Sequence, residues 1–235
     1  MQRTPAMVVI HPGESVQHIV LEHPSCARVF DHHGIDYCRG GLDSLAETCR
    51  RHGLDAGRVG LELEAVVAET ADARPPSSAL STPELIEAIV VGYHVRLREV
   101  LPHLRSLAGR VAAAHGDRAP DLLALDAELR RLADDLELHL EDEEDLLFPA
   151  LLGEDVATVE RLLVLIEHED FETRHRLRQL RRLAGDYQPP PWACPAHRAL
   201  FAELATLERE LIEHAELEST ELVTRLRGAR TQEHP

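Results

Sequence analysis

Apolar residues recur every three or four positions along most of this chain, a period that predicts α-helices and not strands. The pattern is clearest over residues 134–152, DDLELHLEDEEDLLFPALL. The leucines in and next to this segment fall on one stripe: Leu132, Leu136, Leu140, Leu147 and Leu151. His139 and Glu143 lie in or beside that stripe, on one helical face. An imidazole and a carboxylate in a helical core need a partner, because an unpaired buried charge costs several kcal/mol. A metal ion is one possible partner.

Helix start and stop signals divide the larger, C-terminal part of the chain into four segments. Thr82-Pro83-Glu84 combines a cap residue with proline at the first helical position, and Gly228 follows the last apolar stripe. The expected helices cover residues 82–114, 120–149, 154–184 and 195–227. Four long helices joined by short loops predict an antiparallel four-helix bundle.

The N-terminal part has shorter periodic segments, separated by glycines at positions 34, 40, 41 and 53. Short helices are expected over residues 14–22, 24–31, 42–52 and 55–69. A Pro/Ser-rich stretch, ARPPSSALS, follows as a linker. The sequence therefore predicts an all-α protein in four parts: a small helical domain over 1–72, a linker over 73–81, a bundle over 82–228 and a tail over 229–235.

One loop of the N-terminal domain carries reactive chemistry, the segment Asp36-Tyr37-Cys38-Arg39-Gly40-Gly41. A thiol beside an arginine and near a helix N-terminus has a lowered pKa and more thiolate, so Cys38 is a candidate for a catalytic thiol. The other interpretation is a tight Gly-Gly turn around a buried, inert cysteine. The sequence leaves both open.

The charge and composition of the chain restrict the classes of partner that it can bind and the compartment in which it is expected. The formal charge of −17 argues against nucleic acid and anionic membrane, which both select basic surfaces. The chain has no apolar run of about 18 residues and no signal-peptide pattern at its start, and its four cysteines form no CxxC pair. We therefore expect a cytoplasmic protein with reduced thiols.

Histidines occur on all four predicted bundle helices. His94, His139 and His214 lie in apolar stripes, and His214 has Glu218 four residues on. His168 is less well placed, because Leu177 and Leu180 lie well round the helix from it. Each His–Glu spacing also fits an exposed helix pair worth about 0.3–0.5 kcal/mol. One histidine per facing helix instead favours a shared metal site.

The number of candidate ligands restricts the metal. Four imidazoles with two or three carboxylates exceed what a tetrahedral zinc site uses and suit a pair of iron or manganese ions. A ferritin-like site needs two inward ExxH motifs, and only Glu172 to His175 has that spacing on a suitable helix. Histidine-dominated ligation with HxxxE spacing resembles hemerythrin.

Motifs along nearly the whole chain resemble the Repair of Iron Centres family of di-iron proteins. They are, in order, DYCRGGLDSLAE, YHVRLREVLPHL, HLEDEEDLLFP, EHED and PPPWAC. The resemblance implies a cysteine-bearing N-terminal domain before a hemerythrin-like bundle with two non-haem iron ions, bridged by oxo and carboxylate groups. It implies terminal ligands and bridging carboxylates at these positions: His94, His139, His168 and His214 for the first role, Glu143 and Glu218 for the second.

The function implied by the resemblance is repair of iron–sulfur clusters damaged by nitrosative or oxidative stress, by donation of iron. Its partners would be damaged iron–sulfur proteins or a scaffold, together with nitric oxide or oxygen as small ligands. Two alternatives stay open: a di-iron nitric oxide reductase, which would be an enzyme, and a hemerythrin-like oxygen or nitric oxide binder or sensor. A homodimer is also left open.

Three positions depart from the family pattern. Arg39 stands where the family usually has a second adjacent cysteine, so a vicinal thiol pair is not available, although Cys38 can still act alone. The fourth helix ends in LESTELVTRL instead of a LENxxLFP motif. Glu172 occupies a position where hemerythrin proper carries histidine, and it is expected to be a seventh ligand, a base beside the ligands or an exposed salt-bridge partner.

Overall fold

The computed structural model describes residues 8–37, 43–69, 80–153, 156–218 and 222. Within these residues the chain is helical, and the one β-type contact is an isolated bridge between Ser15 and Ser44. The all-α prediction is therefore confirmed. The chain divides into two compact units, Met1–Arg74 with Tyr187–Leu204 and Pro75–Asp186 with Ala205–Pro235.

The helices of the N-terminal part are short, as predicted. They are α1 (Val16–Glu22), the 3-10 turn η1 (Pro24–Cys26) leading into α2 (Ala27–His32), α3 (Leu45–His52) and α4 (Ala56–Glu69). Ser15 and Ser44 cap α1 and α3 by accepting the backbone N–H three residues on. Gly53 ends α3 in the left-handed conformation at φ 68°, which a residue without Cβ adopts easily. Fully buried apolar side chains hold these helices together: Ile19, Phe30, Leu45 and Leu63.

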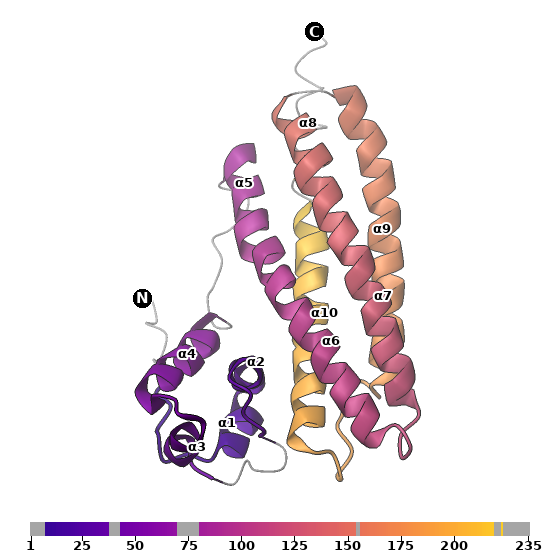
Figure 1. The fold of residues 1–235 in the computed structure, drawn as a ribbon. Coiled ribbons are helices and arrows are strands. Elements are labelled where there is room, and N and C mark those ends of the chain that lie inside the picture. Colours follow the sequence, from indigo (N-terminus) through magenta and orange to yellow (C-terminus); the bar gives the residue numbers. More distant parts are fainter. Residues whose placement is uncertain (1–7, 38–42, 70–79, 154–155, 219–221, 223–235) are drawn as a thin grey trace, which may run out of the picture. The chain divides into compact units, whose positions relative to one another are not determined.

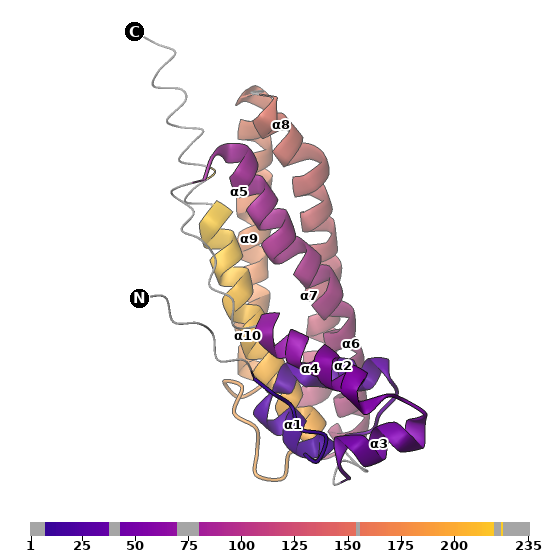
Figure 2. The same ribbon diagram turned by 90° about the vertical axis from the view of Figure 1, so that its left-hand side faces the viewer.

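The bundle is built from long helices that run alongside one another (Figures 1 and 2). The first predicted helix is continuous, but it is made of three parts: α5 (Thr82–Ile89), the π-helical turn η3 (Val90–His94) and α6 (Val95–His115). The second likewise comprises α7 (Asp121–Asp142), the π-helical turn η4 (Glu143–Leu147) and α8 (Phe148–Leu152). The third is α9 (Val156–Leu183), and α10 (Pro195–Leu217) begins where the fourth was predicted.

Apolar packing fixes which face of each bundle helix points inward. Leucines of α6 and α7 line the interior, among them Leu97, Leu104, Leu129 and Leu136, and each is at most 2% exposed. Around α8 buried apolar residues pack into one cluster: Leu85, Ile86, Ile89, Leu147, Phe148, Leu151, Val159 and Leu222. Polar side chains that share a helical face with these residues are carried into the core. Among the described residues, no helix is both long and apolar enough to cross a membrane.

Candidate metal centre

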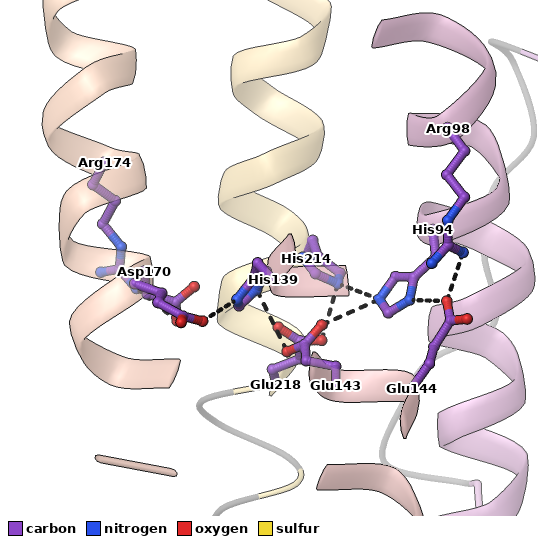
Figure 3. Close-up of polar contacts among 10 residues, drawn as sticks. His94, Arg98, His139, Glu143, Glu144, Asp170, Arg174, His214 and Glu218 are labelled. Atoms are coloured by element: carbon purple, nitrogen blue, oxygen red, sulfur yellow. Dashed lines mark hydrogen bonds and ion pairs between the residues drawn. The ribbon is translucent and has the colours of Figure 1, made fainter. Parts of the chain in front are cut away.

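Five of the predicted site residues meet in the interior of the bundle (Figure 3). Each is at most 4% exposed although each is polar or ionisable. They come from η3, α7, η4, α10 and the residue that follows α10: His94, His139, Glu143, His214 and Glu218. This convergence from distant parts of the sequence is the arrangement that the histidine pattern predicts for a shared site.

Two π-helical turns of the bundle, η3 and η4, coincide with this cluster. His94 is the last residue of η3, and Glu143 is the first residue of η4. A π-helical turn holds more residues than an α-helical turn, so it changes the direction of the side chains that follow, and such turns are frequent at functional sites. The helices therefore depart from regular α-helical geometry where they carry the candidate ligands His94 and Glu143.

Carboxylates orient two of the imidazoles so that their Nε2 atoms point into the cluster. The Nδ1 atom of His94 lies 2.7 Å from Oε1 of Glu144, and that of His139 lies 2.9 Å from Oε2 of Glu169. A carboxylate that accepts a hydrogen bond from Nδ1–H keeps the proton on Nδ1, which leaves the Nε2 lone pair of the neutral imidazole available to a metal ion. The Nε2 atoms of His94 and His214 are 3.0 Å apart, a spacing at which both can contact one ion.

Glu144 is itself held in place by Arg98, whose guanidinium donates to the same carboxylate oxygen at 2.7 Å. Partial burial acts against ionisation, but the hydrogen bonds from Arg98 and His94 outweigh it and lower the pKa of Glu144. The side chain is therefore a carboxylate that accepts from His94. Arg98, Glu144 and His94 form a chain from the surface into the cluster (Figure 3).

The carboxylate of Glu143 faces two different histidines. Its Oε2 atom is 3.4 Å from Nε2 of His94, and its Oε1 atom is 3.5 Å from Nε2 of His139. Glu218 approaches the third imidazole, with Oε1 at 2.9 Å from Nε2 of His214. Glu143 thus lies between His94 and His139, and Glu218 lies against His214.

The same two carboxylates lack hydrogen bonds. None of the four oxygens of Glu143 and Glu218 accepts a hydrogen bond of good geometry from the described residues. A buried polar atom without such a bond costs about 1–3 kcal/mol, and more when it is charged. The cluster is thus incomplete as a set of protein groups, and a bound cation is the group that would satisfy all four oxygens.

Burial shifts the ionisation of the cluster. It raises the pKa of Glu143, to which the charge of Glu218 adds. It raises the pKa of Glu218 to about 8, against the opposing charge of His139. For His139 burial alone lowers the pKa, but the hydrogen bond to Glu169 and the charges of Glu143 and Glu218 outweigh it and raise the pKa to about 9. In the absence of a cation, burial therefore shifts Glu143 and Glu218 toward their protonated forms, while the hydrogen bond to Glu169 favours the charged form of His139.

The potential ligand atoms form two overlapping groups, each with its atoms within 4.8 Å of one another. One group is His94, Glu143, His214 and Glu218, and the other is His139, Asp170 and Glu218. Glu218 belongs to both, and Glu143 points toward a histidine of each. The donor set of imidazoles and carboxylates fits first-row transition metals, so these residues form a candidate metal site.

Some predicted site residues lie elsewhere. His168 and Glu172 are on the exposed side of α9 and belong to neither group. Cys38 falls outside the described residues. Cys26 and Cys49 are buried, and burial raises the pKa of the Cys26 thiol to about 12, which makes it an inert core residue.

The structure also adds residues that sequence reasoning missed: Asp170, Glu144 and Glu169. Asp170 carried a usable signal, because it lies seven residues before Leu177 and so shares the inward face of α9. Glu144 and Glu169 carried none, since each stands next to other acidic residues in its segment.

Comparison with known proteins assigns both parts of the chain. Residues 85–226, more than half of the chain, match the hemerythrin HHE cation binding domain, and residues 12–67 match ScdA_N, a domain of unknown function (DUF542). The chain is 32% identical to the iron-sulfur cluster repair protein YtfE of Musicola paradisiaca, over 92% of this chain and 97% of that protein. It is 31% identical to the iron-sulfur cluster repair protein ScdA of Staphylococcus haemolyticus, over 87% and 93% of the two chains.

Proposed function

This chain belongs to the family of iron–sulfur cluster repair proteins with a hemerythrin HHE domain, and from that premise we propose that it carries two iron ions and supplies iron to damaged clusters. The observation that carries the proposal is the pair of overlapping ligand groups that share Glu218. Two ions held this way would satisfy the four carboxylate oxygens that otherwise lack hydrogen bonds.

The proposed roles follow the directions of the side chains. His94 and His214 would hold one ion and His139 the other, each through Nε2. Glu143 would bridge the two ions because its oxygens point to histidines of different ligand groups. Glu218 would bridge them because it belongs to both groups. The ions would supply Lewis acidity and redox chemistry to the site when bound.

This donor set suits a site that binds iron and later releases it to an acceptor. Imidazoles and carboxylates are harder ligands than the thiolates and sulfides of an iron–sulfur cluster, so this site is not expected to retain iron against such a cluster. When an ion leaves, Glu218 can take up a proton, because burial raises its pKa to about 8. Release of iron is therefore expected to be coupled to proton uptake by this carboxylate.

The partner of the transfer would be a protein whose cluster has been damaged by nitric oxide or peroxide, or a scaffold on which clusters are rebuilt. To test this, the iron-loaded chain is incubated with an iron–sulfur enzyme inactivated by nitric oxide, under reducing conditions and without added iron. Recovery of enzyme activity with matching loss of iron from the chain is expected. Recovery no greater than with an equal amount of Glu143→Leu protein would refute the proposal.

Nitric oxide reduction is a second candidate function, favoured by aromatic rings next to the ligands. Phe148 stacks on His94 with ring centroids 5.8 Å apart, and Tyr93 packs against His214 at 5.3 Å. Such an apolar surround suits a small uncharged diatomic ligand. Sustained nitrous oxide formation with an electron donor would support reduction, whereas a single stoichiometric burst would count against it.

A further inference from the structure

Helix α9 brings an aspartate to the metal centre, where the family resemblance places a histidine. Asp170 is 9% exposed and groups with His139 and Glu218, all with ligand atoms within 4.8 Å of one another. Figure 3 shows it on the α9 side of His139, across the cluster from His94. His168, two residues earlier, is exposed and belongs to neither ligand group.

The packing of α9 explains this choice of face. Leu177 and Leu180 are buried, and Asp170 shares their side because seven residues make nearly two helical turns. His168 is nine residues before Leu177, which places it on the opposite side, at about 180° with roughly 100° per residue. Val164 and Phe171 share the outward side, and they are 70% and 59% exposed. Turning His168 inward would turn Asp170 outward.

The Asp170 carboxylate is not taken up by a strong ion pair. On its own helix its salt-bridge partner is Arg174, one turn along α9, with the charged atoms 4.0 Å apart, and across the cluster it faces His139 of the same ligand group. The side chain of Arg174 is 52% exposed, and exposed pairs of this kind contribute little. Asp170 therefore remains available to a cation at the second ligand group.

We propose that Asp170, and not His168, is the ligand that α9 supplies, so that the two metal positions of this chain are chemically different. The inference rests on the proposed pair of ions. One position has two imidazoles, from His94 and His214, and the other has one imidazole, from His139, with the carboxylate of Asp170. Glu218 is common to both.

This asymmetry has a consequence for iron transfer. Replacing an imidazole by a carboxylate makes the Asp170 position harder and richer in oxygen, a donor set that favours Mn²⁺ and Mg²⁺ more than an imidazole-rich one does. The ion held there is expected to be the more weakly bound of the two. It is therefore the ion that leaves first when a chelator or an acceptor competes.

The test compares iron content in the full-length wild type, Asp170→Asn and His168→Ala, each loaded anaerobically with Fe²⁺ and desalted. The wild type and His168→Ala are expected to hold two ions per chain, and Asp170→Asn about one. Loss of iron from His168→Ala, or two ions in Asp170→Asn, would overturn the inference. A wild type that holds no iron would instead refute the proposed function, so the two failures are distinguishable.

A second measurement on the wild type does not depend on how the variants fold. Diethyl pyrocarbonate modification, followed by peptide mapping, reports the accessibility of each histidine with and without Fe²⁺. The buried His139 and His214 are expected to react slowly in both samples, whereas the exposed His168 is expected to react readily and at the same rate with and without iron. Protection of His168 by iron would contradict its exclusion from the site.

Discussion

Replacing Glu218 by glutamine should stabilise the metal-free protein, because burial disfavours the charge of this carboxyl and neither oxygen accepts a hydrogen bond of good geometry from the described residues. Burial raises its pKa from the ordinary 4.5 to about 8. At pH 7 the folded protein must keep a proton that the unfolded chain releases, which costs ~3 kcal/mol for the 2.5 pH steps between 4.5 and 7. Glutamine is uncharged at every pH but buries two N–H donors of its own, so the expected net gain is about 1–3 kcal/mol.

The sign of the pH dependence is part of this prediction. A carboxyl whose pKa is raised in the folded state destabilises the protein only above its unfolded pKa. The advantage of Glu218→Gln should therefore be less than ~1 kcal/mol at pH 5 and grow up to pH 8. Urea unfolding of chelator-treated protein, followed by helical circular dichroism at pH 5 and pH 7, measures it, provided that both proteins have the same m-value.

Two comparisons isolate the cause. Glu216→Gln changes an exposed carboxylate two residues away on the same helix and should shift stability by less than about 0.5 kcal/mol. Addition of Fe²⁺ should stabilise the wild type more than Glu218→Gln, because binding to the folded state adds to its stability. A metal-free Glu218→Gln protein that is less stable than the wild type at pH 7 would contradict this reasoning. It would show that the Glu218 carboxyl already has a stabilising partner in the absence of a cation.

Further outcomes follow from the same geometry. Glu144→Ala should weaken iron binding by about 10–100-fold without unfolding the protein, because it removes the acceptor that orients His94; equilibrium titration with a competing chelator measures this. His139→Ala should lower the iron content, and full content in this variant would show that the helix face is merely packed. The metal-free wild type should lose stability as the pH rises from about 6.5 to 9, because His139, whose pKa is raised in the folded state, contributes stability only while its ring is protonated. Urea unfolding at several pH values measures this loss of stability. Cys26 should stay unmodified by iodoacetamide at pH 8 in the folded protein, and mass spectrometry of the labelled peptide checks this.

The sequence predicted the inward histidines where one apolar stripe dominates a helix. Apolar residues lie on both sides of His94, His139 and His214 along one helical face, so periodicity alone places these imidazoles in the core. Helix α9 has apolar residues on two sides, with Val164 and Phe171 opposite Leu177. Periodicity does not decide between two such stripes, and tertiary packing determines which one is buried.

Other features had no sequence signal. The π-helical turns at His94 and Glu143 depend on how the helices meet, and no residue type marks them. Glu144 belongs to the acidic run 141–145, in which periodicity distinguishes Glu143 as inward but does not reveal that its neighbour reaches His94. Partners of a buried ligand come from other helices and become visible only in three dimensions.

Metal analysis of the wild-type protein, combined with its optical spectrum, tests the central claim most directly. Protein reconstituted anaerobically with Fe²⁺, desalted and then oxidised should contain about two iron ions per chain and show an oxo-to-iron absorption band. The paired ligand groups around Glu143 and Glu218 require this result if they hold two bridged ions. Zinc alone after growth in iron-rich medium, or no retained metal after reconstitution, would contradict it.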